Sequence, residues 1–364
     1  MSPAALVATR TTALPFPLSA PRQQHYYRAR NALYQLFRSR PAGRVLVPDY
    51  HHGNEVRAIR AAGAEVVFYR IDRRLRPDLD ELRQQLRAGA TAIVAIHYLG
   101  LAQPVREIAA LAREYGALFV EDCALALLSD AEDGTPLGSV GDASVFCLYK
   151  TLPVPNGAVL VGSGLGDAAV PRGERACGAF SLGGRVAELL VDGLRVRHPG
   201  VGGRAATLKA RVGGMLTDAG VHRDPTGETG FDVGAVDLRM SRLTSYLLGR
   251  FDYAEIRRRR RGSFLALRDR LAGRASLLVE ALPQGAVPLF FPILVQDKRA
   301  AAAALRARGV AAVEFWNDGD PAAHGFDAMF LRRHVLELPL HQDLDAGHVE
   351  FVANQVLDVI GART

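Results

Sequence analysis

Short apolar runs alternate with longer stretches of mixed polarity through the first half of this 364-residue chain. The runs have the length of buried strands and lie at residues 44–48, 65–69, 92–96 and 117–122. The stretches between them repeat apolar residues three and four positions apart, which predicts helices at residues 28–39, 54–62, 78–86 and 105–115. Buried strands separated by short helices are typical of a mostly parallel sheet with helices on both faces, so we expect an α/β fold.

The second half of the chain has a less regular pattern. One helix is predicted at 187–197, inside a glycine- and arginine-rich region, 163–233, that the pattern otherwise leaves unassigned. A long helical stretch is expected over residues 238–271, as a link between two lobes. Beyond it, the pattern predicts strands at residues 287–295 and 310–316 and helices at residues 298–308 and 345–360. Because the chain exceeds one typical core, we expect a large domain at 1–245, with an N-terminal arm, and a smaller α+β domain at 246–364.

Composition and charge narrow the class of protein. Hydrophobic residues make up 49% of the chain, but no uncharged apolar run reaches the roughly 18 residues of a membrane-spanning helix, so a soluble protein is expected. The first ten residues lack the order of a signal peptide. Three cysteines without a C-x-x-C pair favour a reducing cytoplasm. The net charge of +7 is spread along the chain, which suits an acidic or phosphorylated small ligand as well as nucleic acid.

Lysine is rare in this chain. Of 45 lysine and arginine residues, only Lys150, Lys209 and Lys298 are lysines. An amine can lose its proton and act as a nucleophile, whereas a guanidinium cannot, so a lysine in such a sequence is a candidate for that chemistry. Lys150 follows the apolar run 143–149 and precedes a proline-rich loop, which predicts a strand end where catalytic groups often lie. The alternative is a surface lysine without a function.

Asp122 ends the strand predicted at 117–122. In open α/β sheets, ligands bind outside the carboxyl ends of the strands, so we expect Asp122 and Lys150 to meet there. This pair suits pyridoxal 5′-phosphate (PLP), because the lysine would form a Schiff base with it and the aspartate would keep its pyridine nitrogen protonated. The alternative role for Asp122 is a helix cap or a structural ion pair.

Several motifs along the chain occur together in a known family. They are Phe119-Val-Glu-Asp-Cys-Ala124, Gly141-Asp-Ala-Ser-Val-Phe-Cys-Leu-Tyr-Lys150, Asn156-Gly157, Leu238-Arg-Met-Ser-Arg242 and Leu338-Pro-Leu-His341. In these motifs the chain resembles the DegT/DnrJ/EryC1/StrS family of sugar aminotransferases, which have fold type I of the PLP-dependent transferases. The resemblance implies transfer of an amino group from an amino acid donor, glutamate or glutamine, to a keto acceptor, with a nucleotide-linked ketosugar as a candidate. It also implies a homodimer with shared active sites.

The resemblance assigns site residues by position. It makes Lys150 the Schiff-base lysine and Asp122 the partner of the pyridine nitrogen. Arg30 and Asn31 stand where a Gly-Thr pair usually offers its amides to the cofactor phosphate at a helix N-terminus. Cys147 stands where the family often has a phosphate-binding serine.

Two further cofactor contacts follow from the resemblance. His52 takes the usual position of an aromatic residue stacked on the cofactor ring. Arg239 belongs to the segment 238–241, which resembles the one that a neighbouring subunit lends to the active site.

Three residues depart from the pattern of the family. Leu125 replaces a glutamine that commonly hydrogen-bonds the cofactor, Cys147 is a poorer phosphate donor than serine, and Asp237 replaces an asparagine that the partner subunit offers to the phosphate. A carboxylate there would repel the phosphate unless it turned away. These departures leave a second function open, that of a PLP-binding protein without transaminase turnover that acts as a partner or regulator.

Two other features receive simpler interpretations. Arg257–Arg261 is a run of five arginines that could contact nucleic acid, but its helical context favours a solvated helix face. His51 and His52 have no third ligand at a useful spacing, so no metal site is predicted.

Overall fold

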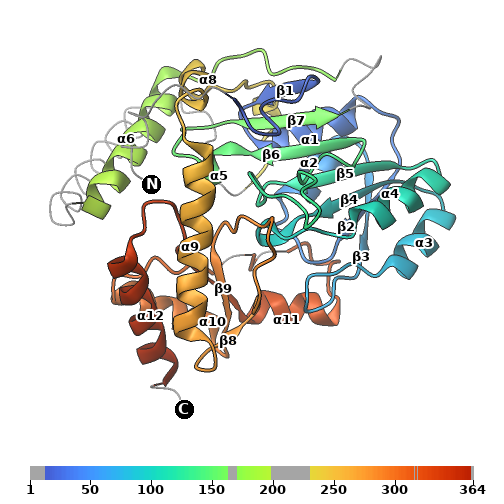
Figure 1. The fold of residues 1–364 in the computed structure, drawn as a ribbon. Helices are drawn as coiled ribbons and strands as arrows, with labels where there is room; N and C mark the ends of the chain where they lie inside the picture. Colours follow the sequence, from blue (N-terminus) through green and yellow to red (C-terminus); the bar gives the residue numbers. More distant parts are fainter. Residues whose placement is uncertain (1–12, 163–169, 198–229, 315, 318, 362–364) are drawn as a thin grey trace.

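A seven-stranded sheet forms the centre of the computed structural model, which describes residues 13–162, 170–197, 230–314, 316–317 and 319–361. The strand order is β1-β7-β6-β5-β4-β2-β3 (Figure 1). The pairs among β2 to β6 are parallel, and β7 pairs antiparallel with both β6 and β1. The strands span Gln23–Tyr26 (β1), Arg44–Pro48 (β2), Glu65–Tyr69 (β3), Ala90–Ile96 (β4), Leu118–Cys123 (β5), Ala143–Cys147 (β6) and Ala158–Gly162 (β7).

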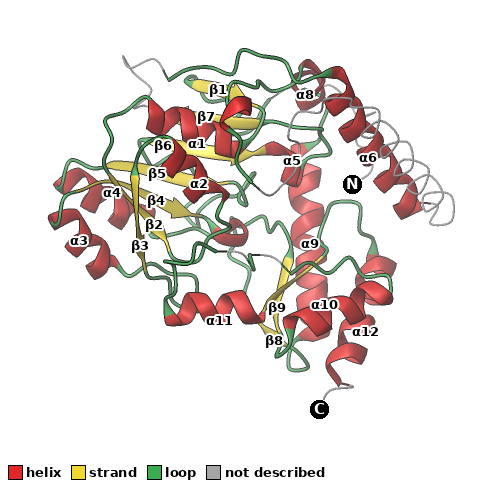
Figure 2. Ribbon diagram, turned by 180° about the vertical axis from the view of Figure 1, so that it is seen from behind, coloured by secondary structure: helices red, strands yellow, loops and turns green. Residues whose placement is uncertain are grey.

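Helices cover both faces of this sheet. The pair α1 (Ala29–Arg38) and α2 (Asn54–Ala61) lies on one face, and α3 (Leu79–Arg87) and α4 (Val105–Glu114) lie on the other (Figures 1 and 2). Successive side chains of a strand point to opposite faces. In β2, Val45 and Val47 therefore pack into the core under α1 and α2, whereas Leu46 packs into the core under α3 and α4. A strand buried on both faces needs an apolar residue at every position, which explains the continuous apolar runs of the sequence.

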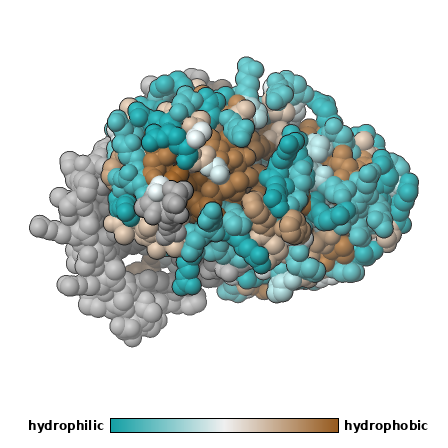
Figure 3. Space-filling model, turned by 90° about the horizontal axis from the view of Figure 1, so that it is seen from below, coloured by the Kyte–Doolittle hydropathy of each residue, from teal (hydrophilic) through white to brown (hydrophobic). Residues whose placement is uncertain are grey.

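A second, three-stranded sheet in the order β10-β9-β8 lies in the C-terminal part (Figure 1). The view from below in Figure 3 shows hydrophobic residues gathered in the middle of that face among hydrophilic ones. One buried hydrophobic cluster joins Phe119 of the large sheet to Phe264 of α9 and Phe291 of β9, so the two lobes share a core. Their division at residue 245 stays a prediction. The remaining elements are α5 (Leu148–Thr151), α6 (Ala179–Arg197), α8 (Arg242–Leu248), α9 (Tyr253–Leu271), β8 (Ser276–Leu277), β9 (Phe291–Leu294), α10 (Lys298–Ala307), α11 (Phe326–His334), β10 (Val335–Leu338) and α12 (Ala346–Gly361), with 3-10 turns at Tyr98–Gly100 and Val233–Ala235.

The expected α/β fold is confirmed, and β2 and β3 have the predicted residues. The apolar run 143–149 was only partly a strand, because β6 ends at Cys147 and the amide of Leu152 then donates to the carbonyl of Leu148, which closes a helical turn. The predicted helix over 238–271 is two helices. Asp252 starts the second of them, since its carboxylate accepts a hydrogen bond from the amide of Glu255.

Two predicted strands of the C-terminal lobe are shorter or absent. The run 287–295 is a strand only at Phe291–Leu294, because the amide of Val287 donates to Ser129 Oγ at 2.9 Å and joins the large lobe instead. The run 310–316 forms no strand, and only Val313 bridges to Glu337 among its described residues. Strand β1, with the polar sequence Gln-Gln-His-Tyr, and the edge strand β7 were not predicted.

The arginine run is the other correction. Arg258 and Arg259 do lie on an exposed face and pair with Glu255, as a solvated face would. Arg260, however, is 1% exposed. Its guanidinium donates to the side chain of Gln342 and to carbonyl groups of four residues, namely Thr151, Pro288, Leu289 and Leu340. Arg260 therefore ties α9 to both lobes. Separately, none of the described helices is both long and apolar enough to cross a membrane.

Replacing Arg260 should destabilise the protein far more than replacing its neighbour Arg258. Arg260→Met keeps an apolar stem but leaves several buried carbonyl groups without a donor, so we expect a loss of about 3 kcal/mol in the free energy of unfolding. Arg258→Met removes only an exposed ion pair and should change it by less than about 0.5 kcal/mol. Urea denaturation of both variants measures the difference. Equal effects would contradict the bracing role of Arg260.

Candidate functional site

A pocket opens at the carboxyl edge of the large sheet. Ile96 at the end of β4, Asp122 near the end of β5 and Cys147 at the end of β6 line it. The N-terminal ends of α1 and α2 close the opposite side. Five of the seven predicted site residues line this one pocket: Arg30, His52, Asp122, Cys147 and Lys150.

Lys150 lies in the short helix α5, directly after β6. Backbone bonds hold both ends of this turn, because the amide of Leu148 donates to the carbonyl of Gly157 and the amide of Leu152 donates to the carbonyl of Leu148. The carbonyl of Thr151, next to Lys150, accepts bonds from Arg260 and from the side chain of Gln342. The amine is therefore carried by a well-supported backbone, as a site of defined geometry requires.

The proline loop after Lys150 is fixed by the N-terminus of α8. Asn156 Oδ1 accepts a hydrogen bond from the amide of Ser241 at 2.9 Å, and the hydroxyl of Thr244 donates to the carbonyl of Asn156 at 3.0 Å. Gly157 has φ +128°, a conformation that side chains rarely adopt, and a Cβ there would lie 3.0 Å from the sulfur of Met240. The motifs Asn156-Gly157 and 238–242 are thus in direct contact.

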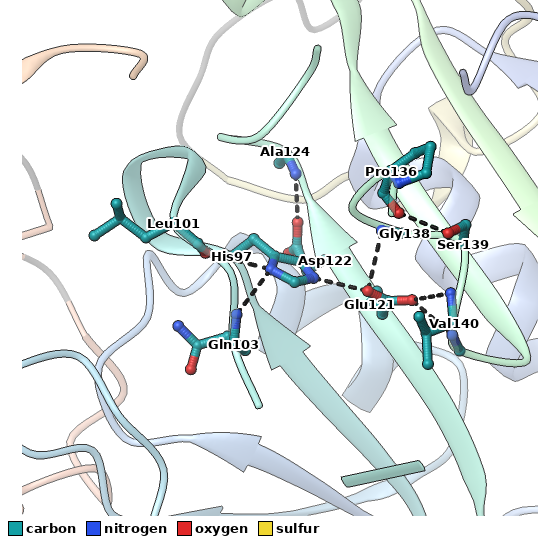
Figure 4. Close-up of polar contacts among 11 residues, drawn as sticks. His97, Leu101, Gln103, Glu121, Asp122, Ala124, Pro136, Gly138, Ser139 and Val140 are labelled. Atoms are coloured by element: carbon teal, nitrogen blue, oxygen red, sulfur yellow. Dashed lines mark hydrogen bonds and ion pairs between the residues drawn. The ribbon is translucent and has the colours of Figure 1, made fainter. Parts of the chain in front are cut away.

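Asp122 is buried, and its carboxylate accepts a hydrogen bond from the amide of Ala124 at 2.9 Å (Figure 4). Burial raises the pKa of Asp122 to about 6, and the negative charge of Glu55 adds to the rise. The bond from Ala124 and the positive charge of Lys150 act in the opposite direction. Asp122 and Lys150 thus line the same pocket, and their roles there stay a prediction.

Glu121 points to the other face of β5 and braces the strand (Figure 4). Its carboxylate accepts hydrogen bonds from three backbone amides, those of Gly138, Val140 and Gly141, and lies 2.8 Å from His97 Nε2. Burial alone would raise the pKa of Glu121, but the bonds from His97 and from these amides hold it below its ordinary value. No role was predicted for Glu121. Because Glu121 and Asp122 are adjacent in a strand, their side chains point to opposite faces of the sheet.

Two groups of residues that contain a histidine could be mistaken for metal sites. His97, Glu121 and Cys123 place ligand atoms within 4.8 Å of one another, but both oxygens of Glu121 are already held by the four bonds just described. His51 contacts the carbonyl of Pro48 through Nδ1 and accepts a bond from the amide of Asp320 through Nε2. Both arrangements are those of structural hydrogen-bond networks.

Three residues expected near the cofactor lie elsewhere in this chain. The side-chain amide of Asn31 donates to the carbonyl of Ala235 at 2.7 Å and does not line the pocket. Arg239 is exposed and also lies outside the pocket lining. The carboxylate of Asp237 is turned to the guanidinium of Arg175, so within its own subunit it does not face the pocket.

Several lining residues were not among the predicted site residues. Arg28 and Tyr149 line the pocket, as do Glu55 of α2 and Trp316 from the C-terminal lobe. Arg28 lies two residues before the predicted Arg30, and Tyr149 adjoins Lys150, so both had a signal in their spacing. For Trp316 the sequence does not distinguish a core position from the rim of an active site, because this residue comes from a loop 166 residues further along the chain than Lys150. Lys209, another of the three lysines, lies outside the described residues.

Comparison with known proteins gives a consistent family. Residues 28–160 match the model of the DegT/DnrJ/EryC1/StrS aminotransferase family, so the chain carries a domain of that family. GDP-perosamine synthase from Vibrio cholerae is 29% identical over 120 residues, 32% of this chain and 32% of the relative. A dTDP-4-dehydro-2,3,6-trideoxy-D-glucose 4-aminotransferase from Saccharopolyspora spinosa is 33% identical over 107 residues, 29% of this chain and 28% of the relative. The match thus spans about a third of the length of these relatives.

Solved structures extend the likeness of fold to most of the chain. The aminotransferase PseC from Helicobacter pylori, involved in the biosynthesis of pseudoaminic acid, matches with a TM-score of 0.68 over 94% of this chain and 88% of that chain, at 17% identity. The aminotransferase TlmJ from Streptoalloteichus hindustanus matches with a TM-score of 0.63 over 94% and 86%, at 22% identity. The fold is therefore that of the DegT-type aminotransferases.

Asp122→Asn should stabilise the protein without bound ligand at alkaline pH but not at acidic pH. The pKa of Asp122 rises from 3.8 to about 6 on folding, so the folded state binds the proton more tightly and the stability contributed by this group falls as the pH rises from 4 to 6. Asparagine does not titrate and can still accept the bond from Ala124. We expect a gain of about 2–3 kcal/mol at pH 8 relative to pH 4.

Urea denaturation of Asp122→Asn and the original protein at the two pH values measures this effect. All other titrating groups that the substitution leaves undisturbed contribute equally to the free energy of unfolding of both proteins, so their contributions cancel in the difference. A constant difference between pH 4 and pH 8 would contradict the raised pKa of Asp122.

Proposed function

We propose that this chain, which carries a domain of the DegT/DnrJ/EryC1/StrS aminotransferase family, is a cytoplasmic PLP-dependent aminotransferase. It would move an amino group from an amino acid, glutamate or glutamine, to a keto acceptor. Two of the relatives named above carry nucleotide-linked sugars in their names, GDP-perosamine and a dTDP-linked dehydro sugar, which favours a nucleotide-linked ketosugar as the acceptor. The observation that carries the proposal is the presence of the Lys150 amine and the Asp122 carboxylate in one pocket at the carboxyl edge of the sheet.

The side chains around the pocket fit PLP. Lys150 offers an amine for its aldehyde, and Asp122 offers a buried acceptor for a protonated ring nitrogen. Arg28 and Arg30 add positive charge at the N-terminus of α1, where a phosphate is favoured by the helix dipole. His52 provides a flat ring at the wall of the pocket. An amine, an acid, cations and a ring are the groups that this cofactor needs.

PLP, when bound, supplies an aldehyde that takes up the amino group and a ring that delocalises electrons. Lys150 would bond to the aldehyde in the resting enzyme and, once displaced by the donor, would carry the proton from the α-carbon of the donor. Asp122 would hold a proton on the ring nitrogen, and the cationic ring would in turn lower the pKa of this carboxyl from its raised value. The same two side chains would serve the acceptor in reverse order.

A second function is favoured by two lining residues. Leu125 is a buried apolar side chain where the resemblance expects a glutamine, and Cys147 presents a thiol where it expects a serine. The first change removes a hydrogen-bonding group for the cofactor, and the second replaces a good donor by a weak one. A protein that binds PLP without turnover, as a partner or regulator, would have this composition. The third possibility, a nucleic-acid-binding module, loses its basis because Arg257, Arg260 and Arg261 bind carbonyl groups of the same chain.

Reduction with borohydride should attach the cofactor to Lys150. Lys298 is the informative comparison, because its buried amine donates to the carbonyl of Arg332 at 2.9 Å and burial lowers its pKa to about 8. Lys150→Ala should abolish labelling and slow transamination by about a thousandfold or more, since the anchor and the proton carrier are lost together. Lys298→Met should leave the label in place.

Peptide mapping locates the label, and loss of the visible absorption band on adding amino donors reports the first half-reaction. A label on Lys209 or Lys298 would overturn the assignment. A yellow protein that keeps its band with every donor would favour the function without turnover.

We further propose a homodimer in which Arg239 reaches the pocket of the neighbouring subunit. Arg239 is exposed, and α8, which follows it, lies beside α6 (Figures 1 and 2). These two helices expose large apolar side chains, with Phe180 and Tyr246 each 61% exposed. Exposed aromatic side chains of this size are typical of protein interfaces.

Mixing two inactive variants tests the shared site. If Lys150 of one subunit works with Arg239 of the other, Lys150→Ala and Arg239→Ala dimers should each be inactive, and random reassortment should restore about a quarter of the activity. Half of the dimers would then be mixed, each with one intact site. Activity no greater than the sum of the separate variants, or a fully active monomer, would contradict the shared site.

A further inference from the structure

Arg332 joins two loops that line the pocket, although it does not belong to the lining itself. It lies in the last turn of α11 and is 6% exposed. Its Nη2 donates to the carbonyl of Asp49 at 2.8 Å, and its Nη1 donates to the carbonyls of His51 at 2.9 Å and Trp316 at 3.0 Å. Asp49 and His51 follow β2, whereas Trp316 comes from the C-terminal lobe. One buried guanidinium therefore links loops of the two lobes.

The loop after β2 is held at the peptide group that precedes His52. The carbonyl of His51 accepts the bond from Arg332, and the amide of His52, which belongs to the same peptide group, donates to Glu55 Oε1 at 2.8 Å. Because both polar groups of this peptide are bonded, its plane is fixed, and His52 lines the pocket from there. Removing the Arg332 guanidinium would release one side of this support.

Trp316 has a backbone conformation that a bulky side chain rarely adopts. Its φ is +59°, which costs free energy in a residue other than glycine and persists only where the surrounding structure holds it. The ring of Trp316 is buried, with its centre 4.8 Å from that of Tyr50 and 5.5 Å from that of Tyr98. The bond from Arg332 acts directly on the carbonyl of this residue. Ring packing and this bond together keep Trp316 in the pocket lining.

Two further contacts dock the same loop on the large lobe. The amide of Asp320 donates to His51 Nε2 at 3.0 Å, and the Asp320 carboxylate pairs with Arg60 of α2. Gly319 lies directly against the guanidinium of Arg332, since a Cβ at this position would overlap it. The loop that contains Trp316, Gly319 and Asp320 is therefore packed against the large lobe, and Arg332 is bonded to both sides of this contact.

We infer that Arg332 is a positioning residue of the site: it docks the loop of Trp316 on the loop of His52, and so fixes two parts of the pocket lining that come from different lobes. Arg332 itself touches no ligand. Its effect on the cofactor rests on the proposed PLP site, whereas its effect on Trp316 does not. When the loop of Trp316 is undocked, fewer molecules have the complete pocket, and the apparent dissociation constant of a ligand rises in proportion.

The fluorescence of Trp316 reports the docking directly, because it is the only tryptophan of the chain. In the ligand-free protein, Arg332→Met should shift the emission to longer wavelength and increase quenching by acrylamide, since the ring becomes exposed to water. Loss of a charge-assisted bond that holds the loop should also raise the dissociation constant of PLP by about tenfold. Arg332→Lys should give smaller changes in both measurements, because an ammonium keeps donors but not the planar fork.

Arg257→Met is the matched control. Arg257 of α9 also donates to carbonyls of distant residues, Leu128 and Gly285, but it lies outside the pocket lining. This variant should leave the emission, the quenching and the PLP constant unchanged. Urea denaturation shows which variants are folded. Gly319→Ala, whose Cβ would displace the guanidinium of Arg332, takes the place of Arg332→Met if that variant is unfolded, and it should shift the emission in the same direction.

The possible failures are distinct. If folded Arg332→Met keeps the original emission and quenching, or if Arg257→Met changes them equally, the inference is overturned while the proposed function stands. An emission shift without a change in the PLP constant would also overturn it, because the docking would then not shape the pocket. Unchanged emission of Gly319→Ala has the same meaning where Arg332→Met is unfolded. If borohydride attaches no cofactor to Lys150, the proposed function fails, whereas the emission of Trp316 still tests the docking.

Discussion

The buried carboxylate of Glu121 holds together the part of the sheet on which the pocket depends. It takes bonds from three amides of the connection between β5 and β6 and from the ring of His97 after β4. These contacts fix the ends of three neighbouring strands relative to one another. Asp122, the next residue, faces the opposite side and lines the pocket. Strand alternation thus lets two adjacent acids serve as a brace and as a ligand group, with environments that move their pKa values in opposite directions.

The amine end of the pocket is supported by a separate set of contacts from the second half of the chain. Arg260 of α9 and Gln342 both hold the carbonyl of Thr151, and Ser241 at the start of α8 holds Asn156. The turn that carries Lys150 lies between these two supports. Hydrogen bonds between residues more than 80 positions apart in the sequence therefore set the location of the Lys150 amine.

The sequence predicted the parts of the fold that local physics determines. Short apolar runs located β2 and β3 to the residue: the run of β2 follows from burial on both faces, whereas β3 is a half-buried edge strand whose β-branched and aromatic residues still mark it. The turn at Leu148–Thr151 was not visible, since apolar residues in a short run look alike in strand and helix. Strand β1 was missed because its polar residues depend on β7 for pairing.

The residues of the candidate site also divide into some that local sequence predicts and others that depend on distant packing. Lys150 and Asp122 were found because each ends an apolar run, and both line the pocket. Arg28 and Trp316 were not predicted as site residues, since their places depend on the packing of a helix start and of a distant loop. Contacts of Asn31 and Asp237 with Ala235 and Arg175 could not be read from spacing either. The position of a residue in a motif predicts where its backbone lies, but it does not predict which way its side chain points.

Several charged side chains are buried around the pocket, and their burial lowers the stability of the fold. Asp122 and Glu55 are two acids in a buried setting, and Arg28 adds a buried guanidinium to the lining of the same pocket. Burial of each charge opposes folding, so the protein without a ligand is less stable than a similar fold with apolar groups at these positions. A ligand with a cationic ring and an anionic phosphate would compensate both ends together. Binding and stability would then be coupled, because any ligand that prefers the folded state stabilises it in proportion to the logarithm of its concentration. The same buried charges that weaken the empty protein are those that would make its preference for such a ligand strong.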